Sequence, residues 1–484
     1  MKHLTILHNN DMHGDFLPED RDGKKTGGLS LLSGYLKKTR EENPNTLYTI
    51  SGDMFQGSII DSEYMGLSTI ELINLLAPDV ATVGNHEVDY GLAHLLFLEK
   101  CAAFPIINAD LFITVNNKRI FNPFRVIRVD GMNIMLIGVL TQETLASAKS
   151  EKVIGSFVDI AEAAKTIAVI CDNYKTTKID MTIILSHLGI EKEKELAQAL
   201  MPELGIDFII GGHSHTFMDK AEVINGIGVV QAGTGTDQIG RIEIDYDDEE
   251  KEITGWRWET VPINEDTAEA DPVMEEMISH YKDTTDQKYK RVVTRFKRRL
   301  THPRREQETE MGNLYADIMQ EDSSFDIMMF GSGSIRKTEL GPLVEYQDMV
   351  ENTPFDDVCY MVTFTGAQFR RVIRHVLRDE AWSGHTEFYQ FSKGVRIVYN
   401  KTTRELKELS LNGKEITDYQ RIKVCVQNYH YKNFDEFLGV PLEEVKKNAK
   451  PRIVAVSVNN IVEEYFSTHT DLDAHVEGRI TIEE

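Results

Sequence analysis

Five short apolar segments in the first half of the chain each end in side chains that can bind a metal ion. The segments and the residues that follow them are Leu4–Asn10 with Asp11 and His13, Tyr48–Ser51 with Asp53, Val80–Val83 with Asn85, Ile183–Ser186 with His187, and Phe208–Ile210 with His213 and His215. Their carboxylate, imidazole and amide groups suit Mn²⁺, Zn²⁺, Fe²⁺, Co²⁺ or Mg²⁺ better than copper or an iron–sulfur cluster. We therefore predict a site for divalent metal ions.

Two of these ends carry pairs of ligand types separated by one residue, Asp11 with His13 and His213 with His215. On extended backbone, residues two apart point to the same side of a strand, so each pair is predicted to chelate together. Glycines beside these residues permit sharp bends and close approach of ligands around small ions. A single motif of this kind is common at the end of a strand. Only the occurrence of all five motifs in one chain is specific enough to indicate a metal site.

The elements that position these residues follow from the alternation of short apolar segments with amphipathic stretches before about residue 245. Strands are predicted at Leu4–His8, Thr46–Ser51, Val80–Val83, Ile134–Val139, Met181–Leu185 and Phe208–Ile210, and helices at Leu29–Arg40, Thr69–Leu76, Gly91–Lys100 and Ile160–Tyr174. Such alternation predicts sheets flanked by helices.

A second unit follows a polar stretch, Ala268–Val293, in which Met274, Ile278 and Tyr281 recur at helical spacing. We predict that this stretch is one long connecting helix. The predicted domains are accordingly residues 1–267 and 294–484, joined by 268–293. The second domain has its own helix, predicted at Glu310–Gln320.

The composition narrows the classes of partner. The 484 residues include 53 Lys and Arg against 78 Asp and Glu, a net charge of −25 that repels a phosphate backbone and excludes nucleic acid polymers as partners. For an anionic small molecule to bind, the negative electrostatic potential of the protein must be reversed locally, which a pair of bound metal ions would do. The absence of a long apolar segment and of a signal-peptide pattern, with four scattered cysteines, predicts no membrane partner and a cytoplasmic protein. The oligomeric state stays open.

The ordered set D-x-H, GD, GNHE, SH and GHxH resembles the calcineurin-like metallophosphoesterase superfamily, and within it the 5′-nucleotidase/UDP-sugar hydrolase family. The resemblance covers nearly the whole chain. It implies a mixed fold of α/β and α+β type: a layered α-β-β-α catalytic sandwich joined by a long helix to a smaller mixed α/β substrate-binding domain. It also implies two divalent ions, one held by Asp11, His13 and His215, the other by Asn85, His187 and His213, with Asp53 bridging both.

His86 matches no ligand position of that family. Two divalent ions about 3.5–4 Å apart clamp a phosphoryl group and acidify a bridging water. We predict that His86 lies over the phosphate, either as an imidazolium that stabilises the transition state or as the acid for the leaving oxygen. Asp89 stands where the family has an orienting carboxylate, and is predicted to hold the His86 tautomer and raise its pKa. Glu87 is predicted to have a structural role.

The segment Gly331–Arg336, which reads GSGSIR, resembles the family's GGGIR turn. The resemblance implies that Arg336 and Arg305 bind substrate oxygens, for which arginine forks are suited. It also implies that Phe355 and Tyr429 stack on the base, an interaction worth roughly 1–3 kcal/mol per ring.

The second domain departs from the family at three places, one of which is Thr301, where the family has a further substrate arginine. The family's GGDGY stretch reads Asn433–Phe437 here, where only Asp435 keeps its position and is predicted to contact substrate. The usual Asn five residues before the turn arginine is Gly331. Recognition of the base and ribose is therefore the part of the prediction that the motifs support least.

The predicted reaction is metal-dependent hydrolysis of nucleotide phosphoesters, foremost of nucleoside 5′-monophosphates to nucleoside and phosphate. A small-molecule nucleotide is the predicted partner. The altered segment Asn433–Phe437 keeps open a 2′,3′-cyclic nucleotide phosphodiesterase or a UDP-sugar pyrophosphatase on the same scaffold. A catalytically inactive nucleotide sensor is a further alternative, which the filled metal positions disfavour.

Overall fold

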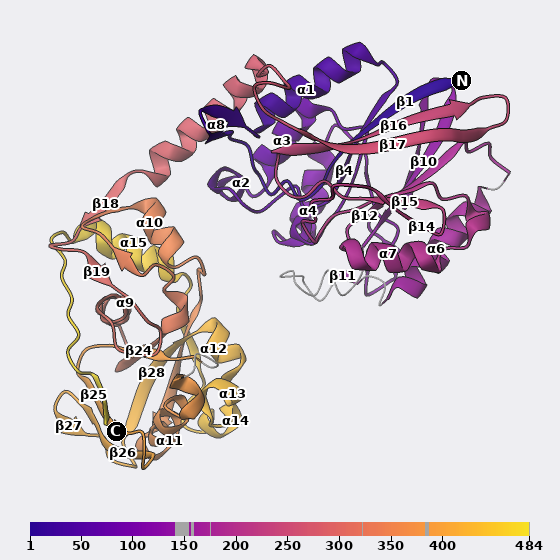
Figure 1. Ribbon diagram of the computed structural model, residues 1–484. Helices are drawn as coiled ribbons and strands as arrows, with labels where there is room; N and C mark the ends of the chain where they lie inside the picture. The colour runs from indigo at the N-terminus through magenta and orange to yellow at the C-terminus, as the bar shows by residue number, and fades with distance from the viewer. Residues whose placement is uncertain (141–153, 156–158, 175, 322, 383–386, 484) are drawn as a thin grey trace. The chain divides into compact units, whose positions relative to one another are not determined.

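The structure is a computed structural model that describes residues 1–140, 154–155, 159–174, 176–321, 323–382 and 387–483 (Figure 1). The chain forms two compact units, Met1–Thr285 and Asp286–Glu484. Helix α8 (Pro272–Tyr289) begins in the first unit and ends in the second, and strand β18 (Val292–Arg295) follows it. Within the described part of the chain, no helix is both long and apolar enough to cross a membrane.

Two six-stranded sheets build the first unit. In spatial order the first contains β17 (Glu252–Pro262), β16 (Gln238–Asp247), β1 (Lys2–Asn9), β4 (Thr46–Ser51), β5 (Val80–Thr82) and β6 (Ile106–Ile107), and the second contains β14 (Glu222–Ile224), β15 (Ile227–Val230), β13 (Phe208–Ile210), β12 (Met181–Ser186), β10 (Met132–Val139) and β9 (Phe124–Val129). Strands β1, β4 and β5 run parallel, with Thr5 opposite Thr46 and Thr49 opposite Val80. Strands β12 and β13 run parallel in the second sheet, with Ile183 opposite Phe208.

The two sheets face each other across a buried apolar layer that includes Leu4, Leu47, Ile134, Ile183 and Phe208. The outer face of the first sheet packs against α1 (Leu29–Glu42), α3 (Leu67–Leu76), α4 (Leu92–Cys101) and α8, and that of the second against α6 (Ile160–Asn173) and α7 (Ile190–Ala199). Figure 1 shows α1 and α3 on one side of the sheets and α6 and α7 on the other. The predicted α-β-β-α sandwich is confirmed.

This topology explains why the predicted ligands converge. The strands that precede them are β1, β4 and β5 in one sheet and β12 and β13 in the other, and within each sheet these strands are parallel. Because parallel strands place their carboxyl ends at the same sheet edge, the loops that follow them meet there. The sequence thus assembles one site from five separate segments.

The second unit is a mixed α/β structure, as predicted. A five-stranded sheet has the order β24 (Tyr389–Phe391), β20 (Ile327–Gly331), β28 (Arg421–Gln427), β23 (Cys359–Thr365) and β29 (Arg452–Ala455), and a four-stranded sheet the order β27 (Lys414–Glu415), β26 (Glu405–Leu411), β25 (Val395–Asn400) and β30 (Ile480–Glu483). The main helices are α9 (Glu310–Gln320), α10 (Tyr346–Asn352), α11 (Gly366–Val376), α12 (Asn428–Lys432) and α15 (Val458–Thr468). The turn after β20 carries Arg336, and α12 carries Tyr429.

Candidate active site

One group of ligand atoms surrounds the carboxylate of Asp11. His215 Nε2 lies 3.4 Å and His13 Nε2 3.9 Å from Asp11 Oδ1, and the two imidazole nitrogens are 3.0 Å apart. Asp11 is fully buried, so this carboxylate is removed from water. Burying a charge without a compensating partner is costly, which favours a cation between these three side chains. The structure thus brings together the three residues predicted to share one ion.

A second group surrounds Asp53. His187 Nε2 lies 3.0 Å from Asp53 Oδ2. A ring nitrogen of His213 lies close enough to both side chains for the three residues to hold one metal ion together. Asn85 Oδ1 is buried and has no hydrogen-bond partner among the described residues, and the buried His187 Nε2 has only the Asp53 carboxylate beside it, as an ion-pair neighbour. A buried polar atom in a folded protein normally has a partner, so Asn85 Oδ1 indicates one that protein atoms do not provide.

Backbone carbonyl groups determine which imidazole nitrogen faces the site. His187 Nδ1 donates to the carbonyl of Ser51 at 2.8 Å, and His13 Nδ1 donates to that of Gln56 at 3.1 Å. In each ring Nε2 is then the nitrogen that faces the site, and it binds a metal ion in place of a proton. The neighbouring carboxylates of Asp53 and Asp11 raise the pKa of His187 to about 10, although burial acts to lower it. The site therefore has an excess of negative potential that attracts cations.

The backbone of five predicted ligands is in the left-handed region. The φ values are 51° for Asp11, 49° for His13, 52° for Asp53, 81° for His213 and 51° for His215. The prediction that each pair lies on extended backbone is wrong, because β1 ends at Asn9 and β13 ends at Ile210. Left-handed non-glycine residues cost about 1–3 kcal/mol each and persist where the surrounding structure holds them.

Close approach of backbone and ligands also explains the neighbouring glycines. A Cβ on Gly84 would lie 2.2 Å from Asp53 Oδ1, and one on Gly212 would lie 2.9 Å from His187 Nδ1. The amides of Asp11 and His13 donate to the carbonyl groups of Gly52 and Asp53, both at 3.0 Å. Only glycine at positions 84 and 212 leaves space for the ligands in this arrangement.

Two buried carboxylates hold the ligand loops from behind. Glu87 accepts hydrogen bonds from the amides of Asp53 and Met54 at 3.0 and 2.7 Å, and also from the amide of Gly84. Burial raises its pKa to about 7, and the Asp53 carboxylate adds to this effect. Glu87 thus ties the loop after β4 to the loop after β5, which agrees with the structural role predicted for it.

Glu193 on α7 does the same for the second sheet. Its carboxylate accepts from Ser186 Oγ at 3.1 Å, from the Gly212 amide at 3.2 Å and from Gln231 Nε2 at 2.6 Å. Burial raises the pKa of Glu193 to about 7. Sequence reasoning missed this residue, because an acidic side chain in the first turn of a polar helix is typical of a solvent-facing position.

His86 and Asp89 form a hydrogen-bonded pair beside the ligands. His86 Nδ1 lies 2.7 Å from Asp89 Oδ2, and the His86 amide donates to Asp53 Oδ1 at 2.9 Å. The hydrogen bond to Asp89 raises the pKa of His86 above its usual value, although burial acts to lower it. The His86 ring is 5.3 Å from the His13 ring, and 35% of its side chain is exposed. The structure therefore brings an accessible imidazole, with its tautomer held by a carboxylate, to the edge of the ligand cluster.

In the second unit, the residues predicted to bind substrate are exposed. Phe355 and Tyr429 expose 40% and 56% of their surface, and the Arg336 guanidinium lies over the Phe355 ring at 5.0 Å. Arg305 is also exposed and its carbonyl accepts from Ser332 Oγ at 2.7 Å, beside the turn that leads to Arg336. Exposed aromatic and guanidinium groups are what stacking and anion binding require.

Asp435 has a local contact. Its Oδ1 accepts a hydrogen bond from the Leu442 amide at 2.7 Å, at the start of α14 (Leu442–Val445). The contact gives this carboxylate a structural role. Its predicted contact with substrate stays a prediction.

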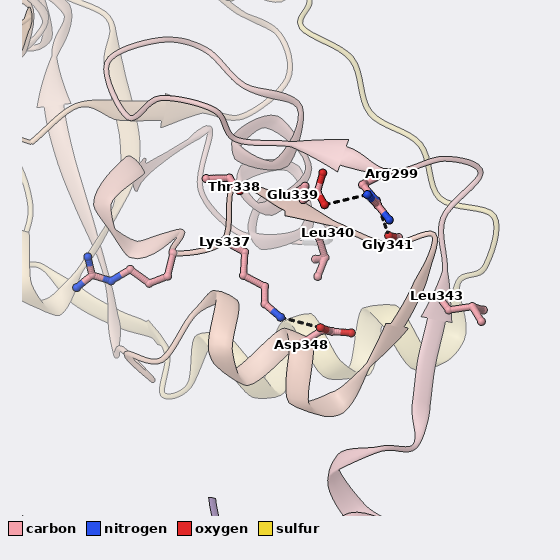
Figure 2. A pocket seen from close by; sticks show the side chains of 9 residues that line it. Arg299, Lys337, Thr338, Glu339, Leu340, Gly341, Leu343 and Asp348 are labelled. Atoms are coloured by element: carbon pink, nitrogen blue, oxygen red, sulfur yellow. Dashed lines mark hydrogen bonds and ion pairs between the residues drawn. The ribbon is translucent and has the colours of Figure 1, made fainter. Parts of the chain in front are cut away.

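A pocket of about 510 Å³ borders Arg336 in the second unit. Figure 2 shows that two ion pairs line it, Arg299 with Glu339 at 2.9 Å and Lys337 with Asp348 at 2.7 Å. These four charges neutralise one another within the lining. Arg336 adds one positive charge, so the lining as a whole keeps an excess of one positive charge.

Comparison with known proteins agrees with this geometry. Residues 4–217 match the calcineurin-like phosphoesterase family, and residues 286–440 match the C-terminal domain family of 5′-nucleotidases. The chain therefore combines a calcineurin-like phosphoesterase domain with a 5′-nucleotidase C-terminal domain. The predicted resemblance is confirmed.

Individual relatives in this group align over most of the chain. A 5′-nucleotidase-related protein of Glossina morsitans morsitans is 28% identical, over 90% of this chain and 84% of the relative. A trifunctional nucleotide phosphoesterase of Bacillus subtilis is 27% identical over 85% of this chain, which corresponds to 30% of the length of that relative. The solved 5′-nucleotidase precursor of Thermus thermophilus has the same fold, with a TM-score of 0.61 at 22% identity over 100% of this chain and 99% of that one.

The residues present in this calcineurin-like phosphoesterase fit divalent cations. The cluster combines the imidazoles of His13, His187, His213 and His215, the carboxylates of Asp11 and Asp53, and the amide oxygen of Asn85. The buried Asn85 Oδ1, which has no hydrogen-bond partner among the described residues, belongs to this set. Mixed nitrogen and oxygen donors of this kind favour divalent cations of the Mn²⁺, Zn²⁺ and Fe²⁺ type.

Proposed function

We propose that this phosphoesterase hydrolyses nucleoside 5′-monophosphates to nucleoside and phosphate with the help of two divalent metal ions. The observation that carries the proposal is the cluster around Asp11 and Asp53, with Asn85 Oδ1 buried and lacking a hydrogen-bond partner among the described residues. The nucleotide part of the proposal is supported by exposed Phe355 and Tyr429 in the second unit. It is also supported by the names of the relatives.

In this proposal the chain provides two overlapping ligand sets. Asp11, His13 and His215 would hold one ion, Asn85, His187 and His213 the other, and Asp53 both. Ions bound there neutralise phosphoryl charge and make hydroxide available at neutral pH. The carboxylates and imidazoles of the chain fix where the phosphate must sit, because they surround a single edge of the sheets.

His86 is proposed to manage the proton of the leaving group. Asp89 occupies Nδ1, so Nε2 is the nitrogen that can face the substrate. An imidazolium in this position stabilises negative charge on the phosphoryl oxygens and can protonate the departing ribose oxygen. The raised pKa of His86 favours the protonated form that both roles need.

We propose residues 1–267 as the catalytic domain, 294–484 as the nucleotide-binding domain and 268–293 as the connection. The helix predicted over all of 268–293 is shorter in the structure, because α8 covers Pro272–Tyr289 and β18 begins at Val292. Arg305 and Arg336 would bind oxygens of the substrate, and Phe355 and Tyr429 would stack on its base. We further propose a cytoplasmic location. It is supported by the four cysteines, all of them free and three of them buried, as in proteins of a reducing compartment.

Phosphate release from AMP and from a simple aryl phosphate, with Mn²⁺ and with EDTA, tests the proposal. We expect AMP to be the better substrate by kcat/KM and EDTA to abolish its hydrolysis. Hydrolysis of the aryl phosphate alone would refute the nucleotide part while leaving the metal site standing. Activity that survives exhaustive chelation would refute the metal-dependent reaction.

A second candidate function is cleavage of 2′,3′-cyclic nucleotides or of UDP-sugars. It is favoured by the altered segment Asn433–Phe437 and by the relative named a trifunctional nucleotide phosphoesterase. These substrates release no phosphate in the first step, so the assay must follow nucleoside monophosphate by chromatography. Nucleoside monophosphate formed faster from them than nucleoside from AMP would favour this second function.

A further inference from the structure

A buried histidine packs against the turn that leads to Arg336. His430, on α12, is 1% exposed, and a Cβ on Gly331 would lie 2.4 Å from its Cε1. No side chain fits at position 331 while the ring stays in place. The resembled family usually has Asn at this position, so the histidine ring fills space that a side chain at position 331 would otherwise take.

Glu387 connects this histidine to the same turn. Its Oε1 accepts from the Gly333 amide at 2.8 Å, and its Oε2 lies 3.6 Å from His430 Nε2. Burial acts to raise the pKa of Glu387, but His430 and the Gly333 amide outweigh it, so the pKa is below its usual value. The carboxylate is therefore an ionised acceptor for the Gly333 amide, and the His430 ring lies beside it.

Gln427 adds a third link at the end of β28. Its Oε1 accepts from the Gly331 amide at 2.8 Å, and its Nε2 donates to Ser334 Oγ at 3.0 Å. The turn is thus bound to Gln427, the residue before α12, at Gly331 and at Ser334, and to Glu387 at Gly333. Tyr429 is the residue directly before His430, and their rings are 5.7 Å apart.

Packing alone does not account for a histidine at this place. Neither Nδ1 nor Nε2 of His430 has a hydrogen-bond partner among the described residues, while the ring contacts those of Tyr389 and Phe437 at 4.9 and 5.5 Å. A buried polar ring with unmet hydrogen-bonding groups is costly, and an apolar side chain would fill the space at a lower cost. The Glu387 carboxylate, 3.6 Å from Nε2, is the polar group beside the ring that favours histidine here.

We propose that His430 and Glu387 are positioning residues that hold the turn of Arg336 and the helix of Tyr429 as one rigid block, and thereby set the affinity for the nucleotide. The inference rests on the proposed function, because Arg336 and Tyr429 are the groups assigned there to substrate binding. A rigid block lowers the entropy lost when a ligand is bound by separate segments. Both residues belong to the second unit, whereas the side chains of the metal cluster all belong to the first, so we expect the chemical step to be spared.

The test compares Glu387→Gln and Gly331→Ala with the wild-type enzyme on AMP and on an aryl phosphate. We expect KM for AMP to rise about tenfold, the change that corresponds to one lost interaction of about 1.4 kcal/mol. We expect kcat on the aryl phosphate to stay within twofold. Glu444→Gln is the matched control, since that carboxylate of the same unit binds Gln368 and Arg371 instead. An unchanged KM for AMP, or equal losses on both substrates, would overturn the inference.

A double-mutant cycle in thermal unfolding tests the contact without any nucleotide. Gly331→Ala should lower the unfolding temperature of the wild-type protein but have a smaller effect in a His430→Ala background, where the clashing ring is gone. Additive effects would overturn the claim that His430 packs the turn. If the wild-type enzyme cleaves only the aryl phosphate, the proposed function is refuted, and so is the effect of this block on nucleotide affinity. The double-mutant cycle would still measure the coupling between positions 331 and 430.

Discussion

Replacing Glu193 by glutamine tests whether the buried carboxylates behind the ligand loops determine metal affinity. In the structure every hydrogen-bonding group around Glu193 donates to it: Ser186 Oγ and the Gly212 amide to Oε1, and Gln231 Nε2 to Oε2. Glutamine has nearly the same shape but presents one amide NH₂ in place of one oxygen. That NH₂ must face a donor whichever way the new side chain is oriented.

The surroundings leave little freedom to relieve this conflict. A rotation of the Gln231 amide would remove the hydrogen bonds that its Oε1 accepts from Ser214 Oγ at 3.0 Å and from the Thr216 amide at 3.2 Å. The backbone amide of Gly212 cannot turn. One buried donor therefore loses its partner, which costs about 1–3 kcal/mol.

The loops that bear the strain are those of His187 and His213, so metal affinity should fall with stability. Loss of an outer partner of this kind typically weakens metal binding about 10–100-fold. Titration of the metal-depleted protein with Mn²⁺ by calorimetry, with thermal unfolding in parallel, measures both effects. Glu191→Gln is the matched control on the same helix, because its side chain is 84% exposed. A folded Glu193→Gln enzyme with the affinity of the wild type would refute the reasoning.

Three further predictions concern separate parts of the molecule. His86→Ala should lower turnover of AMP about 10²–10⁴-fold with metal content unchanged by elemental analysis, since we propose this imidazole as a proton donor and not as a ligand. Loss of metal would contradict that role, because His86 also lies within reach of His13 and Asp53. Phe355→Ala should raise KM for AMP roughly 5–100-fold, the equivalent of about 1–3 kcal/mol of stacking, with no change on an aryl phosphate; equal losses would exclude stacking. Burial lowers the pKa of His302 to about 4 in the folded protein. Below pH 6.5 the unfolded chain therefore binds more protons at this residue than the folded protein does. The free energy of unfolding should accordingly fall by about 3 kcal/mol between pH 6.5 and pH 4. Denaturant unfolding at both pH values should show a smaller fall in His302→Gln, and an identical fall would contradict the assignment.

The sequence predicted the framework of the site well, because buried parallel strands have an unmistakable pattern. Strands β4 and β13 begin and end at the predicted residues, and so does helix α9. These strands are continuous apolar segments, and their bounds are marked where glycine and ligand residues begin. The order of the strands in the two sheets did not follow from the pattern, and only the α-β-β-α layering came with the family resemblance.

The sequence could not predict how the ligands are held. Two-residue spacing indicates extended backbone, yet Asp11 and His13 lie beyond the end of β1 with positive φ. Nothing local in these residues favours that conformation. It results from hydrogen bonds to Gly52 and Asp53, some forty residues away in the chain. The spacing of apolar residues reports only on residues close together in the sequence, so it cannot predict hydrogen bonds between distant segments.

The same limit applies to Glu193 and His430, and the reason shows where such residues can be found. Each fills space above a glycine: a Cβ on Gly211 would lie 2.0 Å from Glu193 Oε2, and one on Gly331 would lie 2.4 Å from His430 Cε1. Neither glycine has a positive φ, so backbone conformation does not require it. A glycine with ordinary backbone angles next to a functional loop therefore indicates a buried side chain pressed against it. In this chain both side chains are polar, and both hold loops that carry site residues.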